Sequence, residues 1–361
     1  MTVPANPSAE RRLSGGARVA AVLLWILFLL VLGEVVARSF WRIHLGLSLR
    51  DTRGRATMFY PELQTALQQS PRHNDSTTNV LLLGGSTLHR DFGSIAQALQ
   101  ERLTAVTRRR VRVFDMAMPA QTSRDSYYKY QALAGVGFDL VIIYDGFNEV
   151  RANNVPPELF RDDYSHYSYY ELVNDILGAH RLYPLATPYT IEYLFRQVSE
   201  ARAARAGHAV RVPKHRPDST WSKFGSTIRT AEPFRHNIDA ILKMAAARGE
   251  PVILMTFATY FAPGFTPAAF NARQLDYTTH NTSTILWGQP ENVAKGIAAH
   301  NLVIRDLHAA WPATGFVDMA TALPQTREYF NDVCHLTVPG SERFAEILMP
   351  AVLEKLGIAA P

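Results

Sequence analysis

Short apolar runs alternating with helical stretches fill most of the sequence after residue 79, and they restrict the folds open to it. Strands are expected at 80–83, 111–114, 140–144, 252–256 and 316–318, and helices at 94–107, 124–134, 233–248, 292–310 and 339–356. Strands that alternate with helices pair in parallel, because each helix returns the chain to the same end of the sheet. We therefore expect an α/β fold with a parallel sheet and helices on both faces.

Two insertions interrupt this alternation, at 151–230 and 258–290. The first is tyrosine-rich and then basic, and the second is rich in Pro, Thr, Asn and aromatic residues. Long insertions of this kind usually form lids or the walls of binding sites. Their aromatic residues either stack on sugar rings or, more commonly, pack within the core or a lid: Tyr164, Tyr167, Tyr169, Tyr170, Trp221 and Trp287.

The amino-terminal part of the chain is its most hydrophobic segment. A polar, basic leader (1–16) precedes a helix expected at 17–40, and a bilayer span needs roughly 20 residues. A signal-peptidase site at Val35-Val36-Ala37 and a helix buried in the core are the alternatives. We interpret the helix as an uncleaved, single-pass signal anchor, followed by a connector (41–78) and a domain (79–361). A short leader before a large trailing domain favours a domain on the periplasmic or extracellular side.

Charge and cysteine content exclude several kinds of partner and site. The net charge of +5 comes from scattered arginines without the motifs of a nucleic-acid binder, so we expect no nucleic-acid partner. Cys334 is the one cysteine, which excludes an intrachain disulfide and a Cys-based zinc cluster. We expect neither a cofactor nor a metal, and the sequence does not indicate an oligomeric state.

Polar residues follow the first three expected strands. Ser86 comes after Gly84-Gly85, where the alternatives are a tight turn or a phosphate-binding turn without the P-loop lysine. Ala120 lies in the next loop, in which Thr122 or Ser123 caps a helix. Asn148 follows the third strand, either in an Asx turn or with its amide aimed at a developing negative charge. Ligands of open α/β sheets bind at the carboxyl ends of strands, where these residues fall.

A fourth motif, Asp332-x-x-His335, precedes the last helix. The aspartate is placed to orient the histidine and balance its charge, and the histidine to take the proton of Ser86 as a general base. Metal ligation is the competing interpretation, although no further His or Asp at suitable spacing supports it.

The order of these motifs resembles that of the SGNH hydrolases, also called GDSL esterases. The resemblance covers about residues 79–357 without the insertions, and includes the closing His335-Leu-Thr-Val-Pro-Gly340. It implies a flavodoxin-like three-layer α/β/α sandwich, Ser86 as nucleophile, and Asp332 and His335 as the rest of a triad. It further implies an oxyanion hole made by the N–H groups of Ser86 and Ala120 and the amide of Asn148.

Three positions depart from the family pattern. Gly85 replaces the aspartate of Gly-Asp-Ser, Ala120 replaces a glycine, and Glu149 replaces an aspartate. Alanine keeps the N–H group but disfavours positive φ. The resemblance implies an ester hydrolase or O-acyltransferase acting on an acylated small molecule, lipid or envelope glycan. The alternative is a protein that keeps the fold without turnover and serves in glycan binding or assembly.

Overall fold

The computed structural model describes residues 14–45, 49, 54–57, 59–69, 77–107, 109–178, 185–205, 219–284 and 287–359. Most of the expected leader, parts of the expected connector and the basic segment 206–218 lie outside these residues. The chain divides into two compact units. Unit 1 comprises Met1–Gly54 and Ala179–His208, and unit 2 comprises Arg55–Gly178 and Ala209–Pro361.

Unit 2 is built on a five-stranded sheet of order β2-β1-β3-β4-β5 in which every neighbouring pair is parallel. The strands are β1 (Thr77–Gly84), β2 (Arg110–Asp115), β3 (Leu140–Tyr144), β4 (Val252–Met255) and β5 (Gly315–Val317). Each coincides with an expected strand to within a few residues. β3 is buried along its whole length, as its uninterrupted apolar sequence requires of a central parallel strand.

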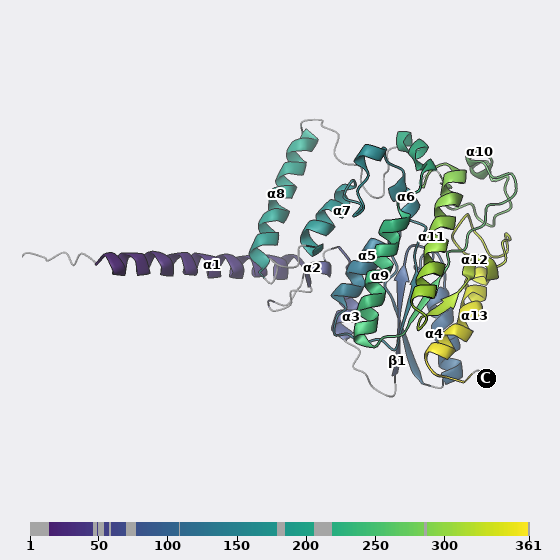
Figure 1. Cartoon of the computed structure of the whole chain (residues 1–361), viewed down its shortest axis with the longest axis horizontal. Coiled ribbons are helices and arrows are strands. Elements are labelled where there is room, and N and C mark those ends of the chain that lie inside the picture. Colours follow the sequence, from purple (N-terminus) through teal and green to yellow (C-terminus); the bar gives the residue numbers. More distant parts are fainter. Residues whose placement is uncertain are drawn as a thin grey trace, which may run out of the picture. The chain divides into compact units, whose positions relative to one another are not determined.

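Five long helices cover the two faces of this sheet. They are α4 (Ile95–Thr107), α5 (Ser123–Ala132), α9 (Ala231–Arg248), α11 (Pro290–Ala310) and α13 (Val338–Lys355). The step from β1 to β2 runs toward one edge and the step from β2 to β3 runs back past β1, so right-handed crossovers place α4 and α5 on opposite faces. α13 packs against α4, whereas α5, α9 and α11 pack in a row (Figure 1). The expected three-layer α/β/α fold with a parallel sheet is thereby confirmed, in the flavodoxin-like strand order.

Shorter helices lie in the connections of unit 2. They are α3 (Leu63–Gln69), α6 (Glu149–Asn153), α7 (Ser168–Val173), α10 (Pro267–Asn271) and α12 (Met319–Ala322). Tyr164, Tyr167 and Tyr170 form a small cluster, each at most 1% exposed. These tyrosines therefore pack inside the unit and do not offer rings to a ligand in solution.

Unit 1 pairs two helices, α1 (Gly15–Leu45) and α8 (Ala186–Arg205). Residues Gly15–Ile43 of α1 are long and apolar enough to cross a membrane, with a mean hydropathy of 2.8. α8 comes from the insertion expected at 151–230, which is thus divided between the two units. The division follows the contacts of α8, whose packing partner is α1.

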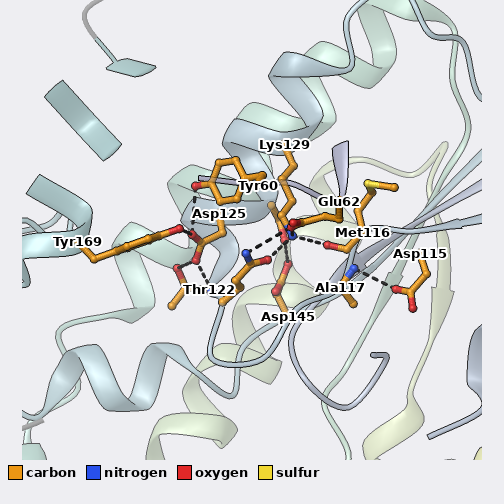
Figure 2. Close-up of polar contacts among 12 residues, drawn as sticks. Tyr60, Glu62, Asp115, Met116, Ala117, Thr122, Asp125, Lys129, Asp145 and Tyr169 are labelled. Carbon is orange, nitrogen blue, oxygen red and sulfur yellow. Dashed lines mark hydrogen bonds and ion pairs between the residues drawn. The ribbon is translucent and has the colours of Figure 1, made fainter. Parts of the chain in front are cut away.

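Part of the segment expected as a connector contributes to the core of unit 2. Tyr60, Leu63 and Ala66 are fully buried, although the sequence there shows little apolar periodicity. The Tyr60 hydroxyl donates to Oδ1 of Asp125 on α5, at 3.1 Å (Figure 2). Burial, with the nearby Asp125 carboxylate, raises the pKa of Tyr60 well above its ordinary value, so the phenol stays protonated.

Lys129 on α5 is the centre of a buried polar cluster, with 1% of its side chain exposed. Its ammonium group pairs with Oε1 of Glu62 at 2.5 Å and also donates to the Met116 carbonyl and the Gln121 side chain (Figure 2). A buried cation needs several acceptors to offset its lost hydration. Lys129 therefore ties α5, the segment before α3 and the loop after β2 together.

We expect Glu62→Ala to lower the free energy of unfolding by about 3 kcal/mol, because it leaves the Lys129 ammonium buried without its counter-ion. Urea unfolding followed by tryptophan fluorescence measures the change. The control is Glu342→Ala, which breaks the exposed 3.1 Å pair with Arg102 and should cost less than about 1 kcal/mol. Equal effects of the two substitutions would contradict a structural role for the buried pair.

Candidate active site

Ser86, His335 and Asp332 form one continuous chain of hydrogen bonds, although 249 positions separate the first two in sequence. Oγ of Ser86 lies 2.8 Å from Nε2 of His335, and Nδ1 of His335 lies 2.8 Å from Oδ2 of Asp332. Ser86 follows β1, whereas the other two residues lie in the loop before α13. The parallel sheet and the last crossover bring both loops to the same edge.

The Asp332 carboxylate is fully buried, and each of its two oxygens accepts two hydrogen bonds. Oδ1 accepts the backbone N–H groups of Cys334 at 3.0 Å and His335 at 2.8 Å. Oδ2 accepts the N–H of Thr282 at 3.0 Å as well as the imidazole. Hydrogen bonds from N–H groups stabilise a carboxylate in its ionised form. The carboxylate is therefore suited to fix the orientation of the ring and balance a positive charge on it.

The environment of His335 restricts the ring further. Phe92 stacks on the imidazole with ring centroids 4.5 Å apart and an interplanar angle of 23°. His335 is 2% exposed, and Ser86 is 7% exposed. Because water has little access to the pair, the hydrogen bond between them competes with few solvent molecules.

The loop after β2 turns sharply at Pro119-Ala120. The Gln121 N–H lies 3.4 Å from the Met118 carbonyl, and Ala120 has a φ of 61°. Proline in the second position followed by a residue of positive φ is the signature of a type II turn, which favours glycine in the third position. Alanine here bears the backbone strain that the sequence suggested, and the turn keeps its shape.

Asn148 lies just before α6, and both ends of its amide are held. Its Nδ2 donates to the Gln121 carbonyl at 2.8 Å, and its Oδ1 accepts from Nε1 of Trp287 at 3.0 Å. The indole donor fixes which end of the amide is nitrogen. A Cβ at position 85 would lie 2.6 Å from Nδ2 of Asn148. The glycine at 85, where the family pattern has aspartate, therefore makes room for this amide.

A small hollow opens between these groups, lined by Gly85, Ser86, Gln121 and Asn148, among others. Its volume of about 10 Å³ is close to what one water molecule needs. Within the described part of the chain, the N–H groups of Ser86 and Ala120 donate to no protein acceptor. The hollow is thus of a size to hold one substrate oxygen.

Two buried carboxyl groups lie behind Asn148. Burial is the main cause of the raised pKa of Asp145 and of Glu149, and their mutual repulsion adds to it for Asp145. Asp145 accepts from the Ser126 hydroxyl at 2.7 Å, and Glu149 from the N–H of Ser123 at 2.5 Å. A raised pKa favours the neutral acid, so these groups support the loop without adding a full negative charge near Asn148.

His300 on α11 supports the same loop from the other side. Burial lowers the pKa of His300 to about 4, which makes the ring neutral at physiological pH. Its Nδ1 lies 2.7 Å from the Gly146 carbonyl, which accepts hydrogen bonds only, so the proton is on Nδ1. Nε2 then accepts from the Thr230 hydroxyl at 2.9 Å.

Asp332, Cys334 and His335 also place one potential metal ligand each within 4.8 Å of one another. Burial, reinforced by the Asp332 carboxylate, raises the pKa of the Cys334 thiol well above its ordinary value. Metal binding requires the thiolate. Both nitrogens of His335 already face protein partners, so the group is better suited to proton transfer than to metal ligation.

The comparisons with known proteins give likeness of structure alone. No protein-family model and no curated protein sequence matches the chain. The chain is similar in fold to solved GDSL-type lipases and esterases. A GDSL-like lipase from Bacteroides thetaiotaomicron is 13% identical, with a TM-score of 0.43, and the match covers 83% of this chain and 98% of the lipase.

Two further solved structures match this chain with similar identity, TM-score and coverage. A lipase/acylhydrolase from Enterococcus faecalis is 14% identical, with a TM-score of 0.41 over 79% of this chain and 100% of that protein. An acetyl xylan esterase is 13% identical, with a TM-score of 0.42 over 76% of this chain and 99% of the esterase. Likeness at this level does not transfer a substrate or an activity to the present chain.

The structure brings all five residues singled out in the sequence to one edge of the sheet: Ser86, Ala120, Asn148, Asp332 and His335. Sequence reasoning did not find the supporting roles of Phe92, Gln121, Thr282 and His300, which no local motif marks. Trp287 was expected either to stack on sugar rings or, more commonly, to pack in the core or a lid, and at 3% exposed it is packed inside the fold. Its contact with Asn148 spans 139 positions, so only the folded chain reveals it.

We expect Ala120→Gly to raise the free energy of unfolding by up to about 1 kcal/mol, because relief of the positive φ exceeds the greater freedom of glycine in the unfolded chain. Urea unfolding measures it. The control, Ala298→Gly on an exposed turn of α11, should have the opposite sign and cost about 0.5–1 kcal/mol. A loss of stability in both variants would contradict strain at Ala120.

Proposed function

We propose that this chain is a membrane-anchored serine hydrolase or O-acyltransferase that cleaves ester bonds, with Ser86 as nucleophile. The observation that carries the proposal is the unbroken hydrogen-bond chain from Ser86 through His335 to Asp332. The Ser86 end of this chain lies at a hollow that Ser86 and Asn148 line. A hydroxyl, an imidazole and a carboxylate in this order are the parts required for acyl transfer through a covalent intermediate.

In the proposed reaction, Nε2 of His335 takes the Ser86 proton while Oγ attacks the ester carbonyl carbon. The carbonyl oxygen becomes an oxyanion, held by the N–H groups of Ser86 and Ala120 and the amide of Asn148. His335 then gives its proton to the leaving alkoxide as the ester C–O bond breaks, which leaves Ser86 acylated. Water or an acceptor hydroxyl, deprotonated by His335, attacks the acyl carbon; the bond from this carbon to Oγ breaks, and His335 returns the proton to Ser86. Hydrolysis and transfer differ only in this second nucleophile.

The proposed oxyanion hole relies on fixed donors. Trp287 holds Oδ1 of Asn148 and the Gln121 carbonyl accepts one hydrogen of Nδ2, which leaves the second Nδ2 hydrogen for a group in the hollow that Asn148 lines. Loss of one such donor typically slows acyl transfer by about 10²–10³-fold. Trp287 therefore acts as a positioning residue through Asn148 and touches no reacting atom.

The membrane anchor is the second part of the proposal. Residues 19–32 of α1 are apolar and largely exposed, which suits contact with lipid. Cleavage after Ala37 would remove Glu34, whose carboxylate accepts the N–H groups of Ala186 and Thr187 at the start of α8. These contacts favour an uncleaved anchor over a released signal peptide. We propose that the substrate is an acylated lipid or envelope glycan close to the membrane, on its periplasmic or extracellular side.

We expect Ser86→Ala in the full-length protein to lower the rate of acetyl-ester hydrolysis by at least about 10³-fold. A fluorophosphonate should label the unsubstituted protein at Ser86 and fail to label the variant. Ser94→Ala is the control, because the Ser94 hydroxyl has no partner among the described residues. Equal rates for Ser86→Ala and the unsubstituted protein would remove the catalytic proposal and favour the alternative of a non-catalytic glycan-binding or assembly protein.

We expect Trp287→Phe to lower kcat roughly tenfold with KM little changed, because the Asn148 amide loses the donor that orients it. The half-exposed Trp221, changed to Phe, should leave both constants as they are. The combined Trp287→Phe and Asn148→Ala variant should be no slower than Asn148→Ala alone. Fully multiplicative effects would show that Trp287 acts independently of Asn148.

A further inference from the structure

Helix α8 carries an apolar stripe that no described part of the protein covers. Ile191, Leu194, Phe195 and Val198 are 62%, 47%, 72% and 50% exposed. Their spacing of three, four and seven positions places them on one face of the helix. Soluble surfaces rarely keep such a continuous apolar stripe in water without a partner.

The start of α8, unlike the stripe, is firmly attached to α1. The Glu34 carboxylate of α1 accepts the first N–H groups of α8, from Ala186 at 2.8 Å and from Thr187 at 3.0 Å. One turn and two turns further along α1, Ala37 and Trp41 are each 4% exposed. Nε1 of Trp41 donates to Oγ1 of Thr190 at 2.7 Å. One face of α1 thus holds the first turn of α8.

This attachment fixes the depth at which α8 leaves α1. Val19–Leu32 is uninterrupted by charge, and Glu34 is the first charged residue after it. A charge at this position marks the end of the segment that hydrocarbon accommodates. α8 therefore begins at the boundary between the apolar core and the headgroups of a bilayer crossed by α1.

The direction of α8 also suits a position along the membrane surface. Figure 1 shows α8 running away from α1 at a steep angle, and both helices belong to unit 1. A helix steeply inclined to a spanning helix runs along the plane of the membrane. Amphipathic helices lie in this interface with their apolar face in the acyl boundary.

We propose that α8 is an interfacial helix whose stripe of Ile191, Leu194, Phe195 and Val198 inserts into the lipid bilayer beside the anchor. The occupant of the stripe is lipid, because α8 starts beside Glu34, directly after the exposed apolar residues 19–32 of α1. The inference rests on the proposed anchoring by α1. It adds a second membrane contact, from a segment about 150 positions later in the chain.

Nitroxide labels on single introduced cysteines test this in the full-length protein, reconstituted in lipid nanodiscs. The substitutions are Phe195→Cys and Leu194→Cys on the stripe, Leu27→Cys on α1 and Ala298→Cys on an exposed turn of α11. Cys334 is 1% exposed, and the unsubstituted protein corrects for its labelling. Power saturation compares collisions with oxygen, which concentrates in hydrocarbon, and with a nickel chelate, which stays in water.

We expect labels at 194 and 195 to resemble the label at 27, with several-fold more oxygen and fewer nickel collisions than the label at 298. Nickel accessibility at 195 equal to that at 298, with 27 embedded, would overturn the inference and leave the anchor intact. Protection of 194 and 195 from both reagents would also overturn it, since a protein partner would then cover the stripe. A label at 27 exposed to nickel would refute the anchor itself.

Discussion

The site depends on a single carboxylate held by four N–H groups. Among the described residues no Lys or Arg pairs with the buried Asp332, and three backbone donors and one imidazole replace its lost water. Without the imidazole, Oδ2 of Asp332 would lose one of its two hydrogen bonds in a buried position. This hydrogen bond therefore holds the Nδ1 side of the ring. Phe92 stacks on the ring, and the remaining nitrogen faces Ser86. The position of the imidazole relative to the Ser86 hydroxyl therefore depends on the hydrogen bonds of the buried Asp332 carboxylate.

Much of this arrangement was predictable because it depends on local sequence. The apolar runs that form β1, β2 and β3 place Ser86, Ala120 and Asn148 at strand ends, and parallel strands end at one edge. The pairing of Asp332 with His335 needs only three positions of separation. Chain direction and short spacing therefore place these residues in loops at one edge, whereas the contact of Ser86 with His335 across 249 positions was expected only from the resemblance to the SGNH hydrolases.

The rest depended on contacts across the chain that no local pattern encodes. Tyr60 and Glu62 belong to a segment without apolar periodicity, yet they meet Asp125 and Lys129 on α5. Position 85 shows how such contacts change the meaning of a motif. In the sequence, Gly85 replaces the aspartate of the family pattern. In the structure, the absence of a side chain at Gly85 leaves room for the Asn148 amide, which Trp287 holds in place.

The interleaving of the two units has a practical consequence. α8 lies between two portions of the hydrolase-like unit in sequence, so deletion of the first 54 residues would not remove unit 1 cleanly. It would remove the contacts of Glu34 and Trp41 with the start of α8 and expose Tyr189, which packs against Trp41. A truncated protein of this kind would expose α8 to solvent without its partner helix. If α8 lies in the membrane interface as proposed, such a truncated protein would still need detergent or lipid for α8.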